Sequence, residues 1–266
     1  MTDLPQPFYT EWPRGRRPAA QAFWHWHSAL VEPTVPRGTA ADAFFDQERA
    51  RTEAGESLHL VREEIYSDAY EACSTHDLSR KLLGAQVEAA RVLHGETRFE
   101  SADELETFVR LWALPHARLL AGLADLTNSV QIGWVDELAR GFFHFAHLVS
   151  LPQDLRKDRL FVPLEDLRQA GVSIDQLREG RVDESVRRLL WKQGVRVRDA
   201  LAQGRSLVND LGFRQRYALK RYWLGMLALL NELERREYDL WSEPLELSLF
   251  RRAQVYLQIV FGRLRL

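Results

Sequence analysis

The chain has 266 residues, of which 45% are hydrophobic and 11% aromatic, so it is long and apolar enough to bury a sizeable core. Its 36 basic and 38 acidic residues leave a formal net charge of −2, which excludes a global positive field of the kind that attracts nucleic acid. We therefore expect no nucleic-acid partner. The single cysteine, Cys73, excludes an intrachain disulfide framework and a cysteine-based metal site, and it favours a reducing, cytoplasmic compartment.

The N-terminal residues 1–15 contain prolines and charged side chains but no apolar signal-peptide core, so we expect an irregular arm that precedes one helical domain, residues 16–266. The longest stretch without a charged residue, residues 18–31, has 14 residues. A helix needs roughly 20 apolar residues to span a bilayer. The sequence therefore predicts no membrane-spanning helix, and at most a peripheral contact with the inner face of the membrane.

Apolar residues recur at three- and four-residue spacing along nearly the whole chain, which is the period of a helix that buries one face. Ser101 with Glu104 three residues later predicts a capping box at the start of one of these helices. Glycine and proline, at 15 and 10 residues, are too sparse for the many turns of an all-β chain. The predicted helices cover residues 16–31, 39–53, 57–72, 76–95, 101–125, 129–151, 183–205, 209–238 and 244–263.

The stretch from residue 151 to residue 173 interrupts this helical pattern. Pro152 and Pro163 each remove a backbone donor, and the apolar run between them is too short for a helix of its own. We expect a structured connector with a short helical turn at residues 164–170, closed by Gly171 as a left-handed cap. No repeat or linker divides the chain, so one all-α domain is the simplest interpretation.

The connector and its flanks carry a resemblance to a known family. The run Arg159-Leu-Phe-Val-Pro-Leu-Glu-Asp-Leu167, followed by Gly171-Val172-Ser173, resembles the segment of squalene and phytoene synthases that reads approximately G-R-V-Y-L-P-x-E-D-L and then G-V-S. Upstream, residues 97–105 resemble that family's R-Y-x-T-x-x-E-L. The resemblance extends from about Ala20 onward. It implies an isoprenoid-synthase-like helical bundle around a central cavity.

The resemblance also implies a chemistry. Family members join two prenyl diphosphates head to head and hold them through Mg²⁺ on two aspartate-rich motifs. Mg²⁺ is a hard cation that takes carboxylate oxygens and gives up its water reluctantly, so each ion needs acidic side chains. An active chain would therefore be a transferase that acts on prenyl diphosphates and requires Mg²⁺.

The acidic residues of those motifs are largely missing from this chain. The first motif, roughly A-D-D-x-x-D-E, falls on residues 23–32, where His27 and Ser28 replace the paired acids and Glu32 remains. The second falls on Phe143, Ala146, Ser150 and Asp154, of which only Asp154 is acidic. The family's Tyr-Cys and Gly-x-x-Gly segment corresponds to residues 108–109 and 113–116, and its Arg-Tyr pair to Arg98-Phe99.

From these losses we expect the magnesium-dependent condensation to be absent and no cofactor to be required. The chain would then be a pseudoenzyme that binds an isoprenoid, another apolar ligand or a protein partner. The alternative is a divergent but active prenyl transferase. In that alternative the basic residues Lys157 and Arg159 hold the diphosphate, although pairing with neighbouring acids also accounts for them.

A third hypothesis is a metal centre rebuilt from histidine. Zn²⁺ or Fe²⁺ accepts imidazole and carboxylate ligands, and such a set would draw on His27, Glu32, His144, His147 and Asp154. His144 and His147 share a helix face, whereas His25 and His27 point apart, so at most one of that pair joins. The competing interpretation is that aromatic residues with neighbouring histidines fill the former pocket.

Three further features have plainer interpretations beside the functional ones. Glu63, Glu64, Asp68 and Glu71 form an acidic helix face, which is expected to be solvated. Cys73 with His76 nearby suggests an activated thiol, but a buried structural cysteine is the default. The last helix, from residue 247 to the C-terminus, mixes aromatic residues with arginines, which fits either a terminal bundle helix or a helix on a membrane surface.

Overall fold

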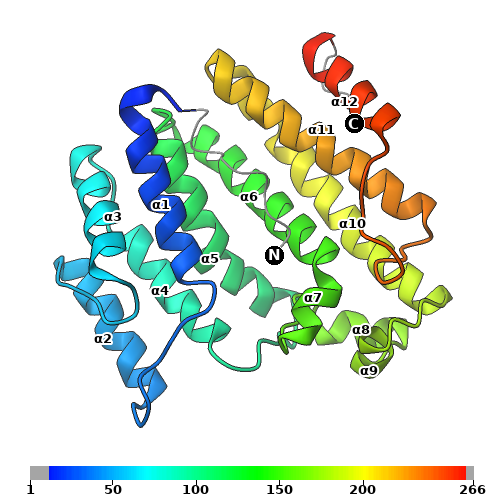
Figure 1. The fold of residues 1–266 in the computed structure, drawn as a ribbon, viewed down its shortest axis with the longest axis horizontal. Helices are drawn as coiled ribbons and strands as arrows, with labels where there is room; N and C mark the ends of the chain where they lie inside the picture. Colours follow the sequence, from blue (N-terminus) through cyan, green and yellow to red (C-terminus); the bar gives the residue numbers. More distant parts are fainter. Residues whose placement is uncertain (1–11, 262–266) are drawn as a thin grey trace. The chain divides into compact units, whose positions relative to one another are not determined.

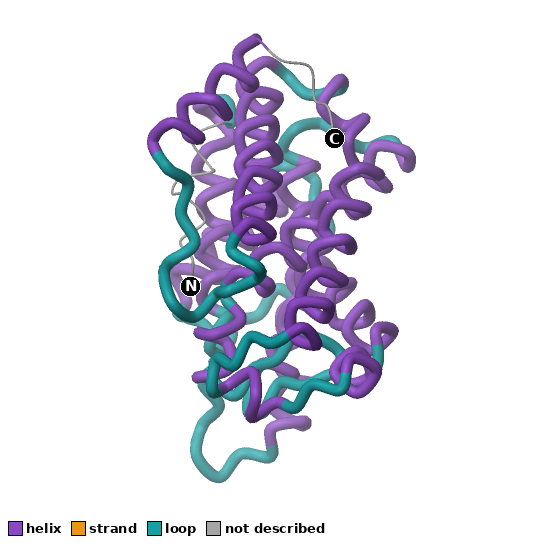
Figure 2. The backbone as a smooth tube through the Cα atoms, turned by 90° about the vertical axis from the view of Figure 1, so that its right-hand side faces the viewer, coloured by secondary structure: helices purple, strands orange, loops and turns teal. Residues whose placement is uncertain are grey.

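The computed structural model describes residues 12–261, with side chains through residue 259. Within this part the chain forms helices and connecting loops, and no extended strand is present (Figure 2). This confirms the predicted all-α fold. The helices are α1 (Arg17–Ala29), α2 (Ala41–Ala54), α3 (Glu63–Thr75), α4 (Lys81–Leu93), α5 (Ala102–Gly122), α6 (Ser129–Val149), α7 (Leu151–Arg156), α8 (Leu164–Ala170), α9 (Ile174–Arg178), α10 (Glu184–Gly204), α11 (Phe213–Arg235) and α12 (Leu249–Phe261), with 3₁₀ helices η2 (Arg14–Arg16) and η3 (Arg205–Asn209).

Four predicted helices begin later than expected. Two of them are α11, predicted from residue 209 and found from Phe213, and α12, predicted from residue 244 and found from Leu249. The other two are α3 and α4. The helix predicted from residue 57 starts at Glu63, because the buried Glu48 carboxylate accepts the backbone N–H groups of His59 and Leu60, both at 2.7 Å, and holds that stretch irregular. The helix predicted from residue 76 starts at Lys81, after a turn in which Asp77 adopts a φ of 52°. Both differences arise from local turn geometry that apolar spacing does not encode.

The connector holds more helix than predicted. Pro152 lies in the first turn of α7, where a missing N–H costs no hydrogen bond, and α9 follows α8 after a short turn. Gly171 closes α8 with a φ of 71°, and the Val172 N–H donates to Leu167 O at 2.9 Å. The predicted left-handed glycine cap is therefore confirmed.

The contacts group the chain into two compact units, and each unit draws on separated stretches of sequence (Figure 1). Of the described residues, one unit, here the N-terminal unit, comprises 12–97 and 106–139. The other, the C-terminal unit, comprises 98–105 and 140–261. The predicted irregular arm lies mostly outside the described residues, and the central cavity stays a prediction. Among the described residues, no helix combines the length and hydrophobicity needed to cross a membrane.

In the N-terminal unit, α1 packs against α3 and α2 packs against α4. The core side chains are large and fully enclosed, with Phe23 and Trp26 from α1 and Phe45 from α2 showing no exposed surface. Arg16 fixes the start of α1 by donating to Leu123 O at 2.5 Å and to both carboxylate oxygens of Asp125 at 2.7 and 2.9 Å. These contacts hold α1 in a defined register within its unit.

In the C-terminal unit, α10 contacts both α8 and α11, and α12 lies beside α11 (Figure 1). The connector is attached to the start of α5 by backbone bonds: the Leu164 N–H donates to Phe99 O at 2.9 Å and the Glu165 N–H donates to Glu100 O at 3.1 Å. The capping prediction for α5 holds in part. Ser101 Oγ accepts the Glu104 N–H at 3.3 Å, but the Glu104 carboxylate accepts the N–H of Glu100 in place of that of Ser101.

Candidate functional site

The first expected motif segment lies on α1 and the turn that follows it. Trp26 is fully buried, His27 and Ser28 are half-buried, and His25 is exposed. Glu32 lies beyond the end of α1 with an exposed side chain. The prediction that only one of His25 and His27 points inward is therefore confirmed, and the inward residue is His27.

His27 is held among three side chains of its own unit. Its Nδ1–H donates to Gln86 Oε1 at 2.9 Å, and Gln86 Nε2 in turn donates to Leu82 O at 3.2 Å. The His27 ring stacks on His116 with the centroids 4.3 Å apart, and it lies 4.2 Å from the Trp112 ring. Two expected motif positions thus meet directly, because His27 stands in the aspartate-rich segment and His116 stands at a Gly-x-x-Gly position.

The imidazole of His116 is kept neutral by its surroundings. Burial lowers the pKa of His116 well below its ordinary value of 6.5, and the neighbouring His27 lowers it further. Its Nδ1 is buried and has no hydrogen-bond partner among the described residues. A glycine at this position would leave the space open, whereas the ring of His116 occupies it and packs on α1.

The second expected motif segment runs from α6 into α7 in the C-terminal unit. Phe143 is 6% exposed, Ser150 is buried, and Ala146 and Asp154 are half-buried. The remaining acid, Asp154, is already engaged: His147 Nδ1–H donates to Asp154 Oδ2 at 2.8 Å, and Ser150 Oγ donates to the same oxygen at 2.6 Å. The segment therefore holds a closed His147–Ser150–Asp154 cluster.

Two aromatic rings pack against the histidine of this cluster. The His147 ring stacks on Phe161 at 3.7 Å between centroids and lies 4.5 Å from the Phe143 ring. His144 packs edge-on against Phe143 at 5.5 Å. In the part of the chain that the structure describes, no group of three or more His, Cys, Asp or Glu side chains is arranged to hold a metal ion.

The chemistry at these positions is a poor match for a magnesium–diphosphate clamp. Mg²⁺ needs several oxygen ligands in near-octahedral geometry, commonly with more than one carboxylate. The second segment offers one carboxylate, Asp154, whose Oδ2 already accepts two hydrogen bonds. The first offers Glu32 alone.

The two proposed diphosphate ligands flank this cluster. Lys157 is exposed and Arg159 is half-buried, and both of their backbone N–H groups donate to Asp154 O at 2.9 Å. The nearby acid Asp158 forms an ion pair with Arg178, with 2.5 Å between Arg178 Nη2 and Asp158 Oδ1. The assignment of Lys157 and Arg159 to a diphosphate stays a prediction.

The most strongly bonded acids of the connector were not identified as such from the sequence. Glu165 accepts the Ala102 N–H at 2.7 Å and so caps α5. Asp166, 2% exposed, accepts from Lys192 Nζ at 2.7 Å, from Gln193 at 3.1 Å and from Arg196 at 2.5 Å. Burial alone would raise the pKa of Asp166, but these hydrogen bonds outweigh it and lower the pKa. The signal available was Lys192 and Arg196, four residues apart on one face of α10.

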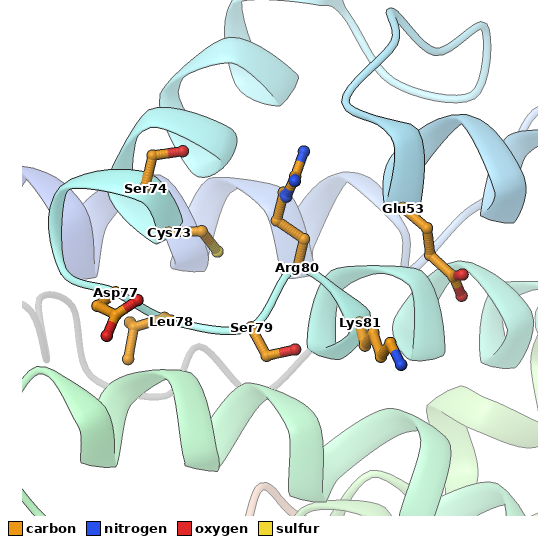
Figure 3. Close-up of a pocket in the computed structure, with 8 residues that line it drawn as sticks. All are labelled: Glu53, Cys73, Ser74, Asp77, Leu78, Ser79, Arg80 and Lys81. Carbon is orange, nitrogen blue, oxygen red and sulfur yellow. The ribbon is translucent and has the colours of Figure 1, made fainter.

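The thiol of Cys73 borders a cavity of about 500 Å³ between α3 and the start of α4, which Arg80 and Lys81 also line (Figure 3). Cys73 is fully buried, and burial raises the pKa of its thiol to about 12. A thiol of that pKa stays protonated at neutral pH and is a weak nucleophile. Cys73 is buried as expected, its structural role stays a prediction, and the acidic face of α3 is exposed as expected.

Comparison with known families gives a match over most of the chain. The profile of the family described as squalene/phytoene synthase matches residues 14–256. The chain is similar to a chloroplastic phytoene synthase of Cucumis melo, with 25% identity over 66% of this chain and 43% of the relative. It is also similar to that of Narcissus pseudonarcissus, with 24% identity over 74% of this chain and 49% of the relative. The chain thus spans about half, or less, of the length of these relatives.

Solved structures resemble the fold over a similar extent. The squalene synthase HpnC from Alicyclobacillus acidocaldarius is 25% identical, with a TM-score of 0.73, and the alignment covers 85% of this chain and 86% of that one. A dehydrosqualene synthase crystallised with a ligand is 12% identical, with a TM-score of 0.77 and coverage of 95% and 88%. At 12% identity the second likeness concerns the fold alone.

Proposed function

The chain belongs to the squalene/phytoene synthase family, and from that premise we propose that it has lost the magnesium-dependent condensation of prenyl diphosphates. In place of that reaction it binds an isoprenoid or another apolar ligand without converting it. The observation that carries the proposal is the stacking of His27 on His116 at 4.3 Å. Two positions that the active family gives to an acid and a glycine are here a pair of aromatic rings in contact.

The two stacked rings make this position unfavourable for a metal ion. The pKa of His116 is lowered by burial, so its ring is neutral and adds no charge to offset a diphosphate. The Nδ1–H of His27 donates to Gln86, and the ring of His27 lies against Trp112 and His116. Stacked, weakly polar surfaces of this kind favour an apolar chain over a hydrated Mg²⁺.

The second segment supports the same conclusion independently. Asp154 already accepts hydrogen bonds from His147 and Ser150, and Mg²⁺ would have to displace them. Phe143 and Phe161 cover His147 and leave this side of the cluster apolar. A cytoplasmic location belongs to the proposal because a chain with one cysteine suits a reducing compartment.

Two rival functions remain as outcomes to be tested. A divergent prenyl transferase would rely on Glu32, Asp154, Lys157 and Arg159, and it would require Mg²⁺. A histidine-based metalloenzyme would bind Zn²⁺ or Fe²⁺ through residues of the predicted ligand set, including His147 and Asp154, whose side chains bond directly. A protein partner bound in place of the isoprenoid is the second form of the non-catalytic role.

The deciding experiment is incubation of the purified chain with farnesyl or geranylgeranyl diphosphate and Mg²⁺, with an active phytoene synthase assayed in parallel. We expect no squalene, no phytoene and no release of pyrophosphate. Formation of any of these products would refute the loss of catalysis. Metal analysis of untagged protein is expected to find no stoichiometric Zn or Fe, and finding either would support the metalloenzyme.

Binding is tested separately with farnesol and farnesyl diphosphate as probes. We expect the two to bind with similar affinity and without dependence on Mg²⁺, because the chain rather than the diphosphate is recognised. His116→Ala should change the affinity, since it removes a ring at the proposed site. His25→Ala, which truncates an exposed histidine on α1, is the matched control and should leave the affinity unchanged.

A further inference from the structure

Helix α12 exposes large apolar side chains that no described residue covers. Leu249 is 83% exposed, Phe250 79%, Tyr256 58% and Leu257 56%. These four side chains are half of the eight large apolar residues that are exposed among the described residues. An exposed apolar cluster on one element indicates an interaction site more often than a scatter of single residues does.

The exposed residues form one stripe of the helix. Leu249 and Phe250 lie two turns before Tyr256 and Leu257, so the four share a face. A second apolar stripe, the half-buried Val255 and the buried Ile259, lies about 140° away around the helix. Because α12 contacts α11 within the C-terminal unit, this second stripe already supplies the packing that holds α12 in the fold.

The charge of this segment has a single sign. Residues 249–266 contain four arginines and no acidic residue. The guanidinium of Arg251 is exposed and donates to the neutral Gln254 at 3.0 Å, but it points away from the exposed stripe. Arg252, also exposed, lies 3.3 Å from the exposed carboxylate of Glu246, a kind of pair that water screens strongly. The exposed stripe is therefore bordered by the positive charge of Arg252 and belongs to a segment of net positive charge.

A second copy of the chain fits this face poorly. The exposed stripe is about 13 Å long and about 10 Å wide, or roughly 130 Å², against the roughly 800 Å² per partner of a stable protein interface. A symmetric pair would also bring like charges from two arginine-rich segments together. A shallow apolar stripe with aromatic residues and flanking arginines matches instead the surface of an anionic bilayer.

We propose that α12 docks the protein on anionic membranes, with Leu249, Phe250, Tyr256 and Leu257 inserted among the lipid head groups. Arg252, at the edge of this stripe, contacts the lipid phosphates. The inserted side chains lie apart from the stripe that packs on α11, so docking requires no unfolding of the C-terminal unit. The role is independent of the ligand proposed for the motif segments.

The test is sedimentation of the full chain with phosphatidylcholine vesicles, with and without phosphatidylglycerol. We expect the chain to pellet with the anionic vesicles and to be released progressively by salt. The double variant Phe250→Ser with Leu257→Ser should bind roughly tenfold or more weakly. Arg252→Gln should bind anionic vesicles about fivefold more weakly and leave binding to neutral vesicles unaffected.

The matched control is Trp191→Ser with Phe213→Ser, which removes two apolar side chains, 53% and 84% exposed, outside α12. It should bind as the unaltered chain does, and both double variants should keep its melting temperature because all four side chains are exposed. Three results would overturn the proposal: no pelleting with anionic vesicles, equal losses in the two double variants, or a dimer or acidic-protein complex that depends on Phe250 while vesicles are not bound.

Discussion

The connector at α8 and the segment from Phe143 to Asp154 lie in the same unit, yet they use their acidic residues differently. In the connector, Glu165 caps α5, and the buried Asp166 accepts hydrogen bonds from Lys192, Gln193 and Arg196. In the other segment Ser150 stands at an acidic position of the family pattern, and the acid that remains, Asp154, bonds only to residues a turn or two away.

The difference separates acids that hold the fold from acids that hold a ligand. Removing Asp166 would leave two cations and an amide without their partner, so the fold itself requires it. Nothing in the fold requires an acid at Ser150, whose hydroxyl donates to Asp154 Oδ2 at 2.6 Å, or a polar side chain at Phe143, which packs among aromatic rings. The connector can therefore keep the sequence pattern of the family while the positions that would bind a diphosphate depart from it.

Phe143→Ala is the change with the largest expected effect on this comparison. Phe143 packs against His147 and Phe161, and its truncation should reduce the free energy of unfolding by about 3–5 kcal/mol, measured by urea denaturation. Phe213→Ala, on an exposed side chain, should cost less than about 0.5 kcal/mol. A small effect at Phe143 would mean that this segment is open, as an active site requires.

Asp166→Ala should destabilise the protein by about 3 kcal/mol, because it leaves Lys192 and Arg196 without their shared carboxylate. The folded pKa of Asp166 is lowered from 3.8, so its contribution is present above about pH 4 and is lost as the pH falls through the folded pKa. Asp158→Ala, which breaks an exposed pair with Arg178, should cost less than about 1 kcal/mol. Equal losses would remove the distinction drawn for the connector.

His116 predicts a pH dependence for the first altered segment. Its folded pKa is lowered, so below pH 6.5 the unfolded chain binds a proton that the folded chain does not. Stability should therefore fall on acidification, by at most about 1.4 kcal/mol per pH unit from this residue. Urea denaturation between about pH 7.5 and pH 5 measures the slope with which the free energy of unfolding changes with pH. These limits span the range in which an ordinary histidine titrates.

His116→Phe keeps an aromatic ring against His27 but cannot titrate, so it should flatten that slope. His25→Phe, on the exposed side of α1, should retain it. If His116→Phe keeps the same pH dependence of stability, then His116 is not the neutral group that causes it.

Asp154→Asn should have the smallest effect, about 1–2 kcal/mol, because it weakens two local hydrogen bonds that are partly open to water. The informative measurement is the melting temperature with and without Mg²⁺. Bound Mg²⁺ would stabilise the folded state, so we expect no magnesium-dependent shift in either the unaltered chain or the variant. A shift that disappears in Asp154→Asn would restore a magnesium site to this segment.

Several elements of the fold were predictable from local pattern. The long helices followed from apolar spacing, and Gly171 was identified as a left-handed cap from its position after α8. The starts of α3 and α4 were wrong, because a distant acid, Glu48, and a turn at Asp77 set them. The shift of Glu104 to the N–H of Glu100 likewise depends on how the connector pairs with Phe99 and Glu100.

The sequence by itself determined an all-helical chain and the absence of acids at the expected motif positions, because helical periodicity and residue identity are local properties. Only the tertiary structure decided what the replacements do. In the structure His27 stacks on His116, and His147 and Ser150 donate hydrogen bonds to Asp154. Asp166 is buried among three donors of α10. These outcomes depend on side chains of different helices meeting in space, and such distances are fixed by packing.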